Sequence, residues 1–267
     1  MSTGVGKPLA LVTGASSGIG RAYAQRLAAD GHDLIVVARR GDRLAELQDL
    51  LEGRHQVTVQ PLVADLSTEA GMAAVDAAVT DPRLATVIDS AALAHYMPLA
   101  DLPQEKLTEL VMLNALAPAR LMQSAVPHMV ERGHGTIVSV ATLLVFSGSS
   151  TAPQLPKRTV YAATKAFLFT FVRLLAAELA DTGVQLQVVC PGIVKTEFHT
   201  RQGLDMSGRP RLDPEDIVEA SMRGLALGEL VCIPSLMDVD AVKHRDEAEA
   251  RILAEGMQAQ LADRYRG

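Results

Sequence analysis

Hydrophobic and polar positions follow two periods that alternate along the chain. Short apolar runs of strand length lie at 8–13, 33–38, 56–60, 85–90, 135–141, 185–190 and 229–233. Longer stretches with a helical period separate them, at 18–30, 42–52, 67–80, 104–132 (with a break near Pro118), 159–182 and 213–227. Strands that alternate with helices are typical of βαβ units around a parallel sheet. The pattern predicts an α/β fold, with one doubly wound domain over residues 1–267 and a seven-stranded parallel sheet.

Composition and charge narrow the classes of partner. The 267 residues are 48% hydrophobic and 21% charged, which is typical of a globular protein with a large core. The net charge of -6 and a pI near 5.6 argue against nucleic acid or an anionic membrane, so we expect a small-molecule partner. No apolar window reaches the length of a membrane span and the start is unlike a signal sequence, so we expect a cytoplasmic protein. Two cysteines, Cys190 and Cys232, favour a reducing compartment.

A glycine-rich turn directly follows the first predicted strand. Residues 13–20 read TGASSGIG and lead into an amphipathic helix. The first glycine permits a tight turn, and the later glycines let the backbone approach a pyrophosphate at the positive end of the helix dipole. The serines alone would be ordinary turn formers. We interpret the turn as a dinucleotide site with the binding residues Gly14, Ser16, Ser17, Gly18, Ile19 and Gly20.

The end of the second predicted strand indicates which dinucleotide binds. The acidic residue that would bind an unphosphorylated adenosine ribose is missing, and Ala38, Arg39 and Arg40 stand there instead. An arginine at this edge pairs with a 2′-phosphate, so we predict NADP (NADPH) rather than NAD. The alternative interpretation is a solvated pair of arginines before the next helix.

Asp65, followed by Leu66, comes after the third strand. Its carboxylate would meet the adenine amino group or cap the next helix.

Tyr161 and Lys165 form a candidate acid/base pair. They stand four residues apart in VYAATKAF, within a predicted helix, and therefore lie on one face. A phenol has an ordinary pKa of about 10, and an adjacent ammonium lowers that pKa because it stabilises the phenolate. Such a pair alone is common on helix surfaces, so its meaning depends on the other motifs.

The motifs together resemble the short-chain dehydrogenase/reductase family over nearly the whole chain. TGASSGIG is similar to the family's cofactor signature, Asp65-Leu66 to its adenine contact, YAATK to its YxxxK pair, and PGIVKT (191–196) to its nicotinamide-side loop. The resemblance implies a single Rossmann-type domain that transfers a hydride between the nicotinamide and a carbonyl or alcohol carbon.

The resemblance also implies roles for single residues. Tyr161 would be the general acid/base, and Lys165 would lower its pKa and hold the nicotinamide ribose. Asn114 would anchor a water that relays protons to Lys165, and Thr196 would hold the carboxamide. Further cofactor contacts are implied at Ala91, Ala92, Pro191, Gly192 and Ile193.

Two positions depart from the family pattern. The family usually places a serine at the end of the fifth strand to bind the substrate oxygen, and here GTIVSVAT ends in Thr142, which keeps the hydroxyl. The gap to the tyrosine is longer than usual, so Ser147 or Ser149 has the more usual separation. We favour Thr142 because the strand end holds its position. DSAA (89–92) stands where NNAG is usual, which adds a methyl group near the cofactor.

The remaining expectations concern the substrate, the assembly and rival functions. Residues 197–212 are polar with no clear period, as expected of a substrate lid, and apolar residues at 143–146 favour a hydrophobic ketone, aldehyde or alcohol. The histidines show no metal-ligand spacing, so we expect no metal. The resemblance implies a homodimer or homotetramer through helices 104–132 and 159–182. Two alternatives stay open: a catalytically weakened dinucleotide-binding sensor or assembly protein, and an imine or enoyl reductase.

Overall fold

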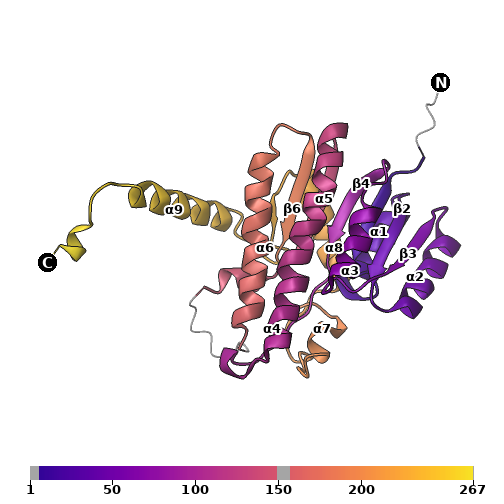
Figure 1. The fold of residues 1–267 in the computed structure, drawn as a ribbon, viewed down its shortest axis with the longest axis horizontal. Coiled ribbons are helices and arrows are strands. Elements are labelled where there is room, and N and C mark those ends of the chain that lie inside the picture. The colour runs from indigo at the N-terminus through magenta and orange to yellow at the C-terminus, as the bar shows by residue number, and fades with distance from the viewer. Residues whose placement is uncertain (1–5, 149–156, 267) are drawn as a thin grey trace. The chain divides into compact units, whose positions relative to one another are not determined.

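A seven-stranded parallel sheet forms the centre of the structure, a computed structural model that describes residues 6–148 and 157–266. The strand order is β3-β2-β1-β4-β5-β6-β7, which confirms the predicted sheet (Figure 1). The strands are β1 Leu9–Thr13, β2 Asp33–Ala38, β3 Val59–Val63, β4 Leu84–Asp89, β5 Gly135–Val140, β6 Val184–Val189 and β7 Val231–Cys232. The order reverses between β1 and β4, and ligands of such sheets bind at the carboxyl ends of the strands beside this point.

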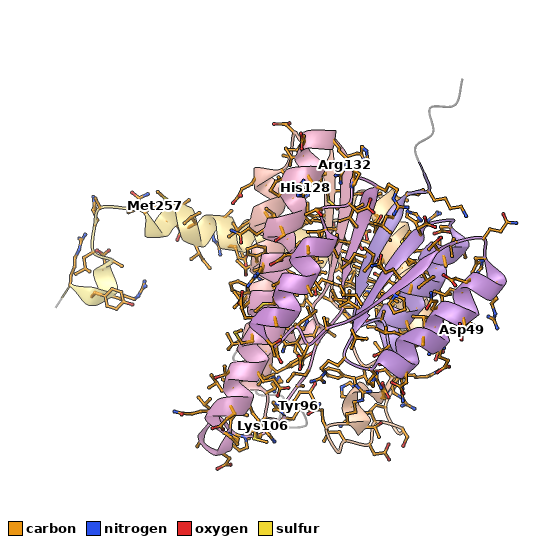
Figure 2. The ribbon with its side chains drawn as sticks, turned by 45° about the vertical axis from the view of Figure 1, so that its right-hand side comes forward. Asp49, Tyr96, Lys106, His128, Arg132 and Met257 are labelled. Carbon is orange, nitrogen blue, oxygen red and sulfur yellow. The ribbon has the colours of Figure 1, made fainter. Side chains whose placement is uncertain are left out.

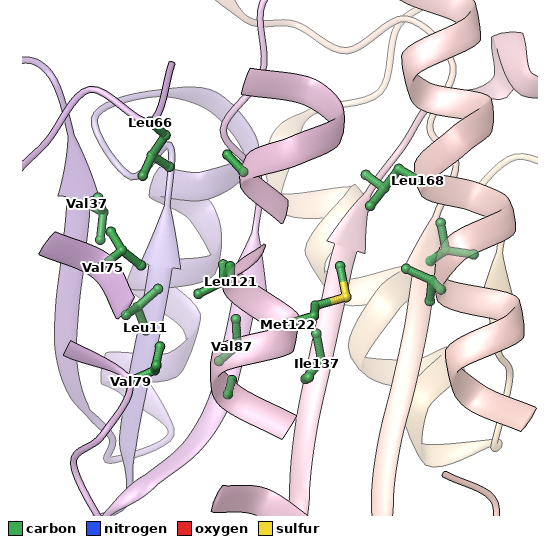
Figure 3. Packing of buried hydrophobic residues seen from close by; sticks show 14 of the residues in the cluster. Leu11, Val37, Leu66, Val75, Val79, Val87, Leu121, Met122, Ile137 and Leu168 are labelled. Carbon is green, nitrogen blue, oxygen red and sulfur yellow. The ribbon is translucent and has the colours of Figure 1, made fainter. Parts of the chain in front are cut away.

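Helices cover both faces of the sheet because successive strand residues point to opposite sides. Leu9 and Leu11 of β1 belong to one core cluster, whereas Ala10 and Val12 belong to the other. Figure 3 shows Leu11 in the first cluster. That cluster includes residues of α3 Glu69–Ala78, α4 Gln104–Val111, α5 Ala117–Arg132 and α6 Thr159–Glu178. The second includes residues of α1 Gly18–Ala29, α2 Gly41–Arg54 and α8 Pro214–Ala226.

Two strands differ from their predicted bounds. We predicted the third strand at 56–60, but it runs over Val59–Val63 and contains Pro61. Proline lacks the N–H of a ladder, yet β3 is the edge strand of the sheet, where that loss is tolerated. The register of β3 is set by its pairing with Leu34–Ala38 of β2. The seventh strand is only Val231–Cys232, shorter than the predicted 229–233.

The long helical stretch at 104–132 is irregular one turn before the predicted break. A π-helical turn over Met112–Leu116 joins α4 to α5. Pro118 near the start of α5 has no N–H to donate to the carbonyl of Asn114, four residues earlier, so one α-helical hydrogen bond is missing beside the π-helical turn. Asn114 lies inside the π-helical turn and is fully buried.

The chain divides into two compact units. The first ends at Pro234, and the second begins at Ser235. The second unit contains α9 Asp240–Gly256, a helix that the sequence analysis did not predict, and a 3-10 turn at Asp263–Tyr265. None of the described residues of α9 is buried. Ion pairs between residues one turn apart, such as Arg245–Glu249 at 2.6 Å, stabilise a helix by roughly 0.2–0.5 kcal/mol each.

One helix corrects the expectation that no stretch is apolar enough to span a membrane. Within the described parts of the chain, α6 alone passes that test of length and composition, with a mean hydropathy of 1.5. α6 buries Tyr161 and Lys165 and contributes Leu168 and Phe169 to the core. We therefore interpret α6 as the core helix of a globular fold.

Candidate active site

The turn after β1 forms a cradle that only small residues permit. Gly14 has a φ of +68°, and a Cβ there would lie 2.9 Å from the backbone of Ser90. A Cβ on Gly20 would lie 2.5 Å from the Gly14 carbonyl oxygen. α1 begins at Gly18, and its N-cap residue Ser17 makes no side-chain capping bond, so the first turn keeps N–H groups for an anion. The cradle therefore fits a dinucleotide phosphate.

Thr13, the last residue of β1, ties this cradle to the end of β4. Its Oγ1 donates to Asp89 Oδ1 at 3.2 Å and accepts the N–H groups of Ser90 and Ala91 at 3.0 Å each. These bonds hold the segment that continues to Ala92 against the glycine-rich turn. Sequence reasoning missed this role, although Thr13 is the first residue of TGASSGIG.

The two arginines after β2 take different partners. The Arg39 side chain is 54% exposed, and its Nη1 lies 3.9 Å from Asp65 Oδ2 and 3.8 Å from Glu109 Oε1. Arg40 turns to the glycine-rich turn, where its Nη2 donates to Ser16 Oγ at 2.8 Å. Arg39 is thus the more accessible of the two at the end of β2, next to Ala38.

Asp65 shapes a turn and is not the cap of α3. Its Oδ1 accepts the N–H of Ser67 at 3.0 Å and the Ser67 hydroxyl at 2.7 Å. The cap of α3 is Thr68, whose Oγ1 accepts the N–H of Gly71 at 3.1 Å. Partial burial opposes ionisation of Asp65, but the Ser67 bonds and the charge of Arg39 outweigh it and lower the pKa of the carboxyl. The structure contradicts the capping alternative, and the adenine contact by Asp65 and the adjacent Leu66 stays a prediction.

The predicted catalytic residues come together from three elements. Tyr161 and Lys165 lie one turn apart on α6, and both are buried. Lys165 Nζ donates to the Val140 carbonyl oxygen at the end of β5 at 2.8 Å. Asn114 is held by Leu93, whose N–H donates to Oδ1 at 3.1 Å and whose carbonyl accepts from Nδ2 at 2.9 Å. Asn114 Nδ2 also lies 3.3 Å from Thr164 Oγ1 of α6, so the end of β5, the π-helical turn and α6 meet at one place.

Thr142, rather than Ser147, is the hydroxyl beside the tyrosine. The Thr142 side chain lies beside Tyr161 and acts to lower the pKa of its phenol. Its Oγ1 also accepts the N–H of Leu144 at 3.3 Å, at the start of the 3-10 turn Leu143–Phe146. Ser147 Oγ donates instead to the Leu144 carbonyl oxygen at 2.7 Å. The other candidate, Ser149, lies outside the described residues.

Burial dominates the electrostatics of these groups. Burial and the nearby Tyr96 raise the pKa of Tyr161, while the Thr142 side chain opposes the rise. The structure shows no lowering of this pKa by Lys165, because the phenol is desolvated and the ammonium is bonded to a backbone carbonyl, so the predicted role of Lys165 toward the phenol stays a prediction. Burial lowers the pKa of Lys165, which the charge of Asp89 opposes. Burial also raises the pKa of Asp89 to about 6.

Aromatic rings pack against the ring of Tyr161. Tyr96, labelled in Figure 2, meets Tyr161 edge-on with the ring centroids 5.6 Å apart. Phe198 lies 5.9 Å from Tyr161, and His199 stacks on Tyr96 at 6.2 Å. Phe198 and His199 belong to the short helix α7 Glu197–Thr200, inside the predicted lid 197–212. Sequence reasoning missed all three rings, because only the fold brings them to Tyr161.

The loop after β6 touches both halves of the site. A Cβ on Gly18 would lie 2.9 Å from Thr196 Cγ2, so this loop packs against the glycine-rich turn. At its other end the Pro191 carbonyl accepts the N–H of Leu143 at 2.8 Å. Gly192 and Ile193 lie between these two contacts in sequence. The segment predicted to face the nicotinamide thus bridges the cofactor cradle and the Thr142 region.

Comparison with known proteins agrees with this geometry. The sequence profile of the family described as short chain dehydrogenase matches residues 8–206. The chain belongs to this family. It is therefore a nicotinamide-dependent dehydrogenase or reductase that acts on small molecules.

Relatives and solved structures extend the match over most of the chain. A protein named an uncharacterized oxidoreductase from Myxococcus xanthus is 33% identical over 224 residues, covering 82% of this chain and 84% of its own. A short-chain dehydrogenase from Sphingobium yanoikuyae, solved in complex with NADPH, has a TM-score of 0.91 and 36% identity, covering 97% and 100% of the two chains. A bulky-bulky ketone specific alcohol dehydrogenase from Comamonas testosteroni has a TM-score of 0.87 and 31% identity, covering 98% and 99%.

Proposed function

We propose that this enzyme is an NADPH-dependent reductase of ketones or aldehydes with hydrophobic substituents, or runs the same reaction in the alcohol-oxidising direction. The observation that carries the proposal is the buried Tyr161, which lies beside the Thr142 side chain and in contact with the rings of Tyr96 and Phe198. A tyrosine with a second hydroxyl beside it suits protonation of a carbonyl oxygen.

The residues of the cradle fit the proposed cofactor. The glycine-rich turn and the start of α1 would hold the pyrophosphate, because backbone N–H groups and a helix dipole meet there. Arg39 would pair with the 2′-phosphate, and Ala38 leaves that place free of a competing carboxylate. The NADPH in the Sphingobium yanoikuyae structure supports this assignment at 36% identity. Thr196 and Lys165 would contact the nicotinamide half.

The chain's own residues would handle the substrate oxygen and its proton. Bound NADPH would supply the hydride. Thr142 would donate a hydrogen bond to the substrate oxygen, and Tyr161 would transfer its proton to that oxygen. Lys165 would stabilise the resulting phenolate once its ammonium leaves the Val140 carbonyl. Asn114 would keep the relay to solvent in place from the π-helical turn.

A hydrophobic substrate follows from the rings around Tyr161. Tyr96 and Phe198 contact the ring of Tyr161 and would present apolar surface to a substrate that reaches its hydroxyl. Leu144 and Val145, which follow β5 and pack against the core, are only partly buried and would offer further apolar surface near Thr142. Such a wall excludes water from the reacting oxygen and favours apolar substituents. The bulky ketones named for the Comamonas testosteroni enzyme agree with this substrate class.

The test is cofactor consumption against a panel of ketones, aldehydes and quinones with NADPH and NADH. We expect turnover with NADPH on apolar ketones or aldehydes, and loss of turnover in Tyr161→Phe with little change in NADPH affinity. Tyr265→Phe, at a 63% exposed tyrosine of the second unit, is the matched control. NADPH binding without turnover on any substrate would favour a dinucleotide-binding sensor or assembly protein. Turnover only on imines or enoyl compounds would favour an imine or enoyl reductase.

The assembly and the compartment are further parts of this proposal. We expect a cytoplasmic homodimer or homotetramer. Apolar side chains on the helices predicted to pair stand exposed, including Val111 at 41%, Leu116 at 43% and Leu174 at 63%. Exposed apolar side chains on neighbouring helices favour an interface between subunits. Light scattering at micromolar concentration tests this expectation, and a monomer alone would contradict it.

A further inference from the structure

Glu197, the first residue of α7, brings a negative charge to the cofactor cradle. Its Oε1 accepts a hydrogen bond from Arg40 Nη2 at 2.8 Å, and Arg43 Nη1 lies 3.2 Å from each of its carboxylate oxygens. Arg201, one turn further on, donates to the same carboxylate. The Ser17 side chain lies close to the carboxylate and helps to lower its pKa. Four groups from three segments of the chain thus converge on one carboxylate.

This set of donors is the kind that binds a phosphate. Arg40 Nη2 also lies 2.8 Å from Ser16 Oγ and 3.0 Å from Ser17 Oγ, so the guanidinium joins the glycine-rich turn to Glu197. Guanidinium groups with nearby hydroxyls recognise phosphate oxygens through charge-assisted hydrogen bonds. The side chains of Arg40 and Glu197 are only 27% and 30% exposed, so solvent screens their attraction incompletely.

The carboxylate of Glu197 stays charged at any ordinary pH. Partial burial opposes ionisation, but the hydrogen bond from Arg40, the Ser17 side chain and the charges of Arg201 and Arg40 outweigh it. Together they lower the pKa of Glu197 to about 2. A second anion that approaches the same donors therefore meets a permanent negative charge.

We infer that Glu197 is an intramolecular competitor of the cofactor's 2′-phosphate, because its carboxylate occupies the guanidinium donors of Arg40 and Arg43 beside the glycine-rich turn. The inference rests on the proposed use of NADPH. Arg39 remains exposed to meet the phosphate first, and the phosphate then takes Arg40 from Glu197. Glu197 thereby weakens the binding of NADPH and speeds its release, which makes it a determinant of cofactor affinity.

The exchange also couples the cofactor to the substrate side of the site. Phe198 and His199 follow Glu197 on α7 and contact Tyr161 and Tyr96. When the phosphate displaces the carboxylate, α7 loses its contact with Arg40, and the packing of Thr196 against Gly18 remains its attachment to the glycine-rich turn. The aromatic wall over Tyr161 is then free to move as the substrate enters.

Calorimetric titration with adenosine 2′,5′-bisphosphate and with 5′-AMP tests the inference without catalysis. In Glu197→Gln the amide keeps the size of the side chain but loses its charge, so we expect the bisphosphate to bind about five- to twentyfold more tightly. Binding of 5′-AMP should change less than about twofold, since it lacks the 2′-phosphate. Glu219→Gln is the matched control, because Glu219 is 71% exposed and pairs with Arg26 on another face of α1.

Amide hydrogen exchange gives a second readout on the wild-type protein. Saturating bisphosphate should increase exchange over residues 197–203, and 5′-AMP should not. Equal or weaker bisphosphate binding in Glu197→Gln, or unchanged exchange in the wild type, overturns the competition. Equal tightening for 5′-AMP overturns the assignment to the 2′-phosphate. If no variant binds either nucleotide, the proposed cofactor fails and the inference fails with it.

Discussion

Asp89 at the end of β4 should make the stability of the protein fall as the pH rises. The side chain is 3% exposed, its Oδ1 accepts from Thr13, and its Oδ2 is buried with no hydrogen-bond partner in the described part of the chain. Burial raises the pKa of this carboxyl, and the charge of Lys165 and the Thr13 bond offset only part of the rise. The folded protein therefore prefers the neutral acid, and ionisation of Asp89 costs stability.

The size of the effect follows from the two pKa values. The pKa of Asp89 is 3.8 in the unfolded chain and about 6 in the folded protein. Complete ionisation therefore lowers the free energy of unfolding by about 3 kcal/mol, and about 1.4 kcal/mol of this is lost between about pH 5 and about pH 7.5. The stabilising contribution of the neutral acid is thus present at low pH and disappears as the pH rises through the folded pKa. Asp89→Asn removes this dependence at nearly constant side-chain volume.

Urea unfolding of the wild type and Asp89→Asn at these two pH values measures the difference. The free energy of unfolding of the variant should rise relative to the wild type by about 1.4 kcal/mol between the lower and the higher pH. Loss of the Asp89 charge also lowers the pKa of Lys165 further, which acts in the same direction. A hydrogen bond that the new amide of Asp89→Asn fails to make lowers the free energy of unfolding of the variant equally at both pH values.

Asp49→Asn controls for the loss of a negative charge, because Asp49 lies exposed on α2 (Figure 2). The difference in free energy of unfolding between Asp49→Asn and the wild type should be the same at both pH values. If Asp89→Asn and the wild type also keep a constant difference, the carboxyl of Asp89 is ionised without penalty and the reasoning from burial fails.

Three further predictions concern the site. Thr142→Ser should keep most activity because the donor remains, while Thr142→Val should lose about a hundredfold in kcat/KM. Ser147→Ala is the control, and wild-type kinetics in Thr142→Val would exclude this hydroxyl. Ala38→Asp should shift the ratio of kcat/KM from NADPH toward NADH, since a carboxylate repels the 2′-phosphate; an unchanged ratio counts against Arg39. Gly20→Ala should lower the free energy of unfolding by about 1–3 kcal/mol, because its Cβ would meet a backbone oxygen at 2.5 Å. Gly53→Ala, which meets nothing within 4 Å, should be neutral or stabilising in urea unfolding, and equal losses at both positions would refute the steric argument.

Local patterns in the sequence determined the elements and the motifs. Alternation of short apolar runs with helical periods specifies a parallel sheet, because each strand must bury both faces under crossover helices. The glycines of TGASSGIG and the four-residue spacing of Tyr161 and Lys165 express constraints within one turn of the chain. Such constraints are visible without knowledge of distant residues.

Contacts between distant segments decided the rest. The register of β3 depends on its pairing with β2, and its place at the edge of the sheet tolerates Pro61. The choice of Thr142 over Ser147 depends on how the end of β5 meets α6. Glu197 reaches Arg40 across 157 positions of sequence, and no local period encodes that contact. The tertiary structure alone determines these features, because the energies of burial and of charge pairing depend on neighbours that only the folded chain brings together.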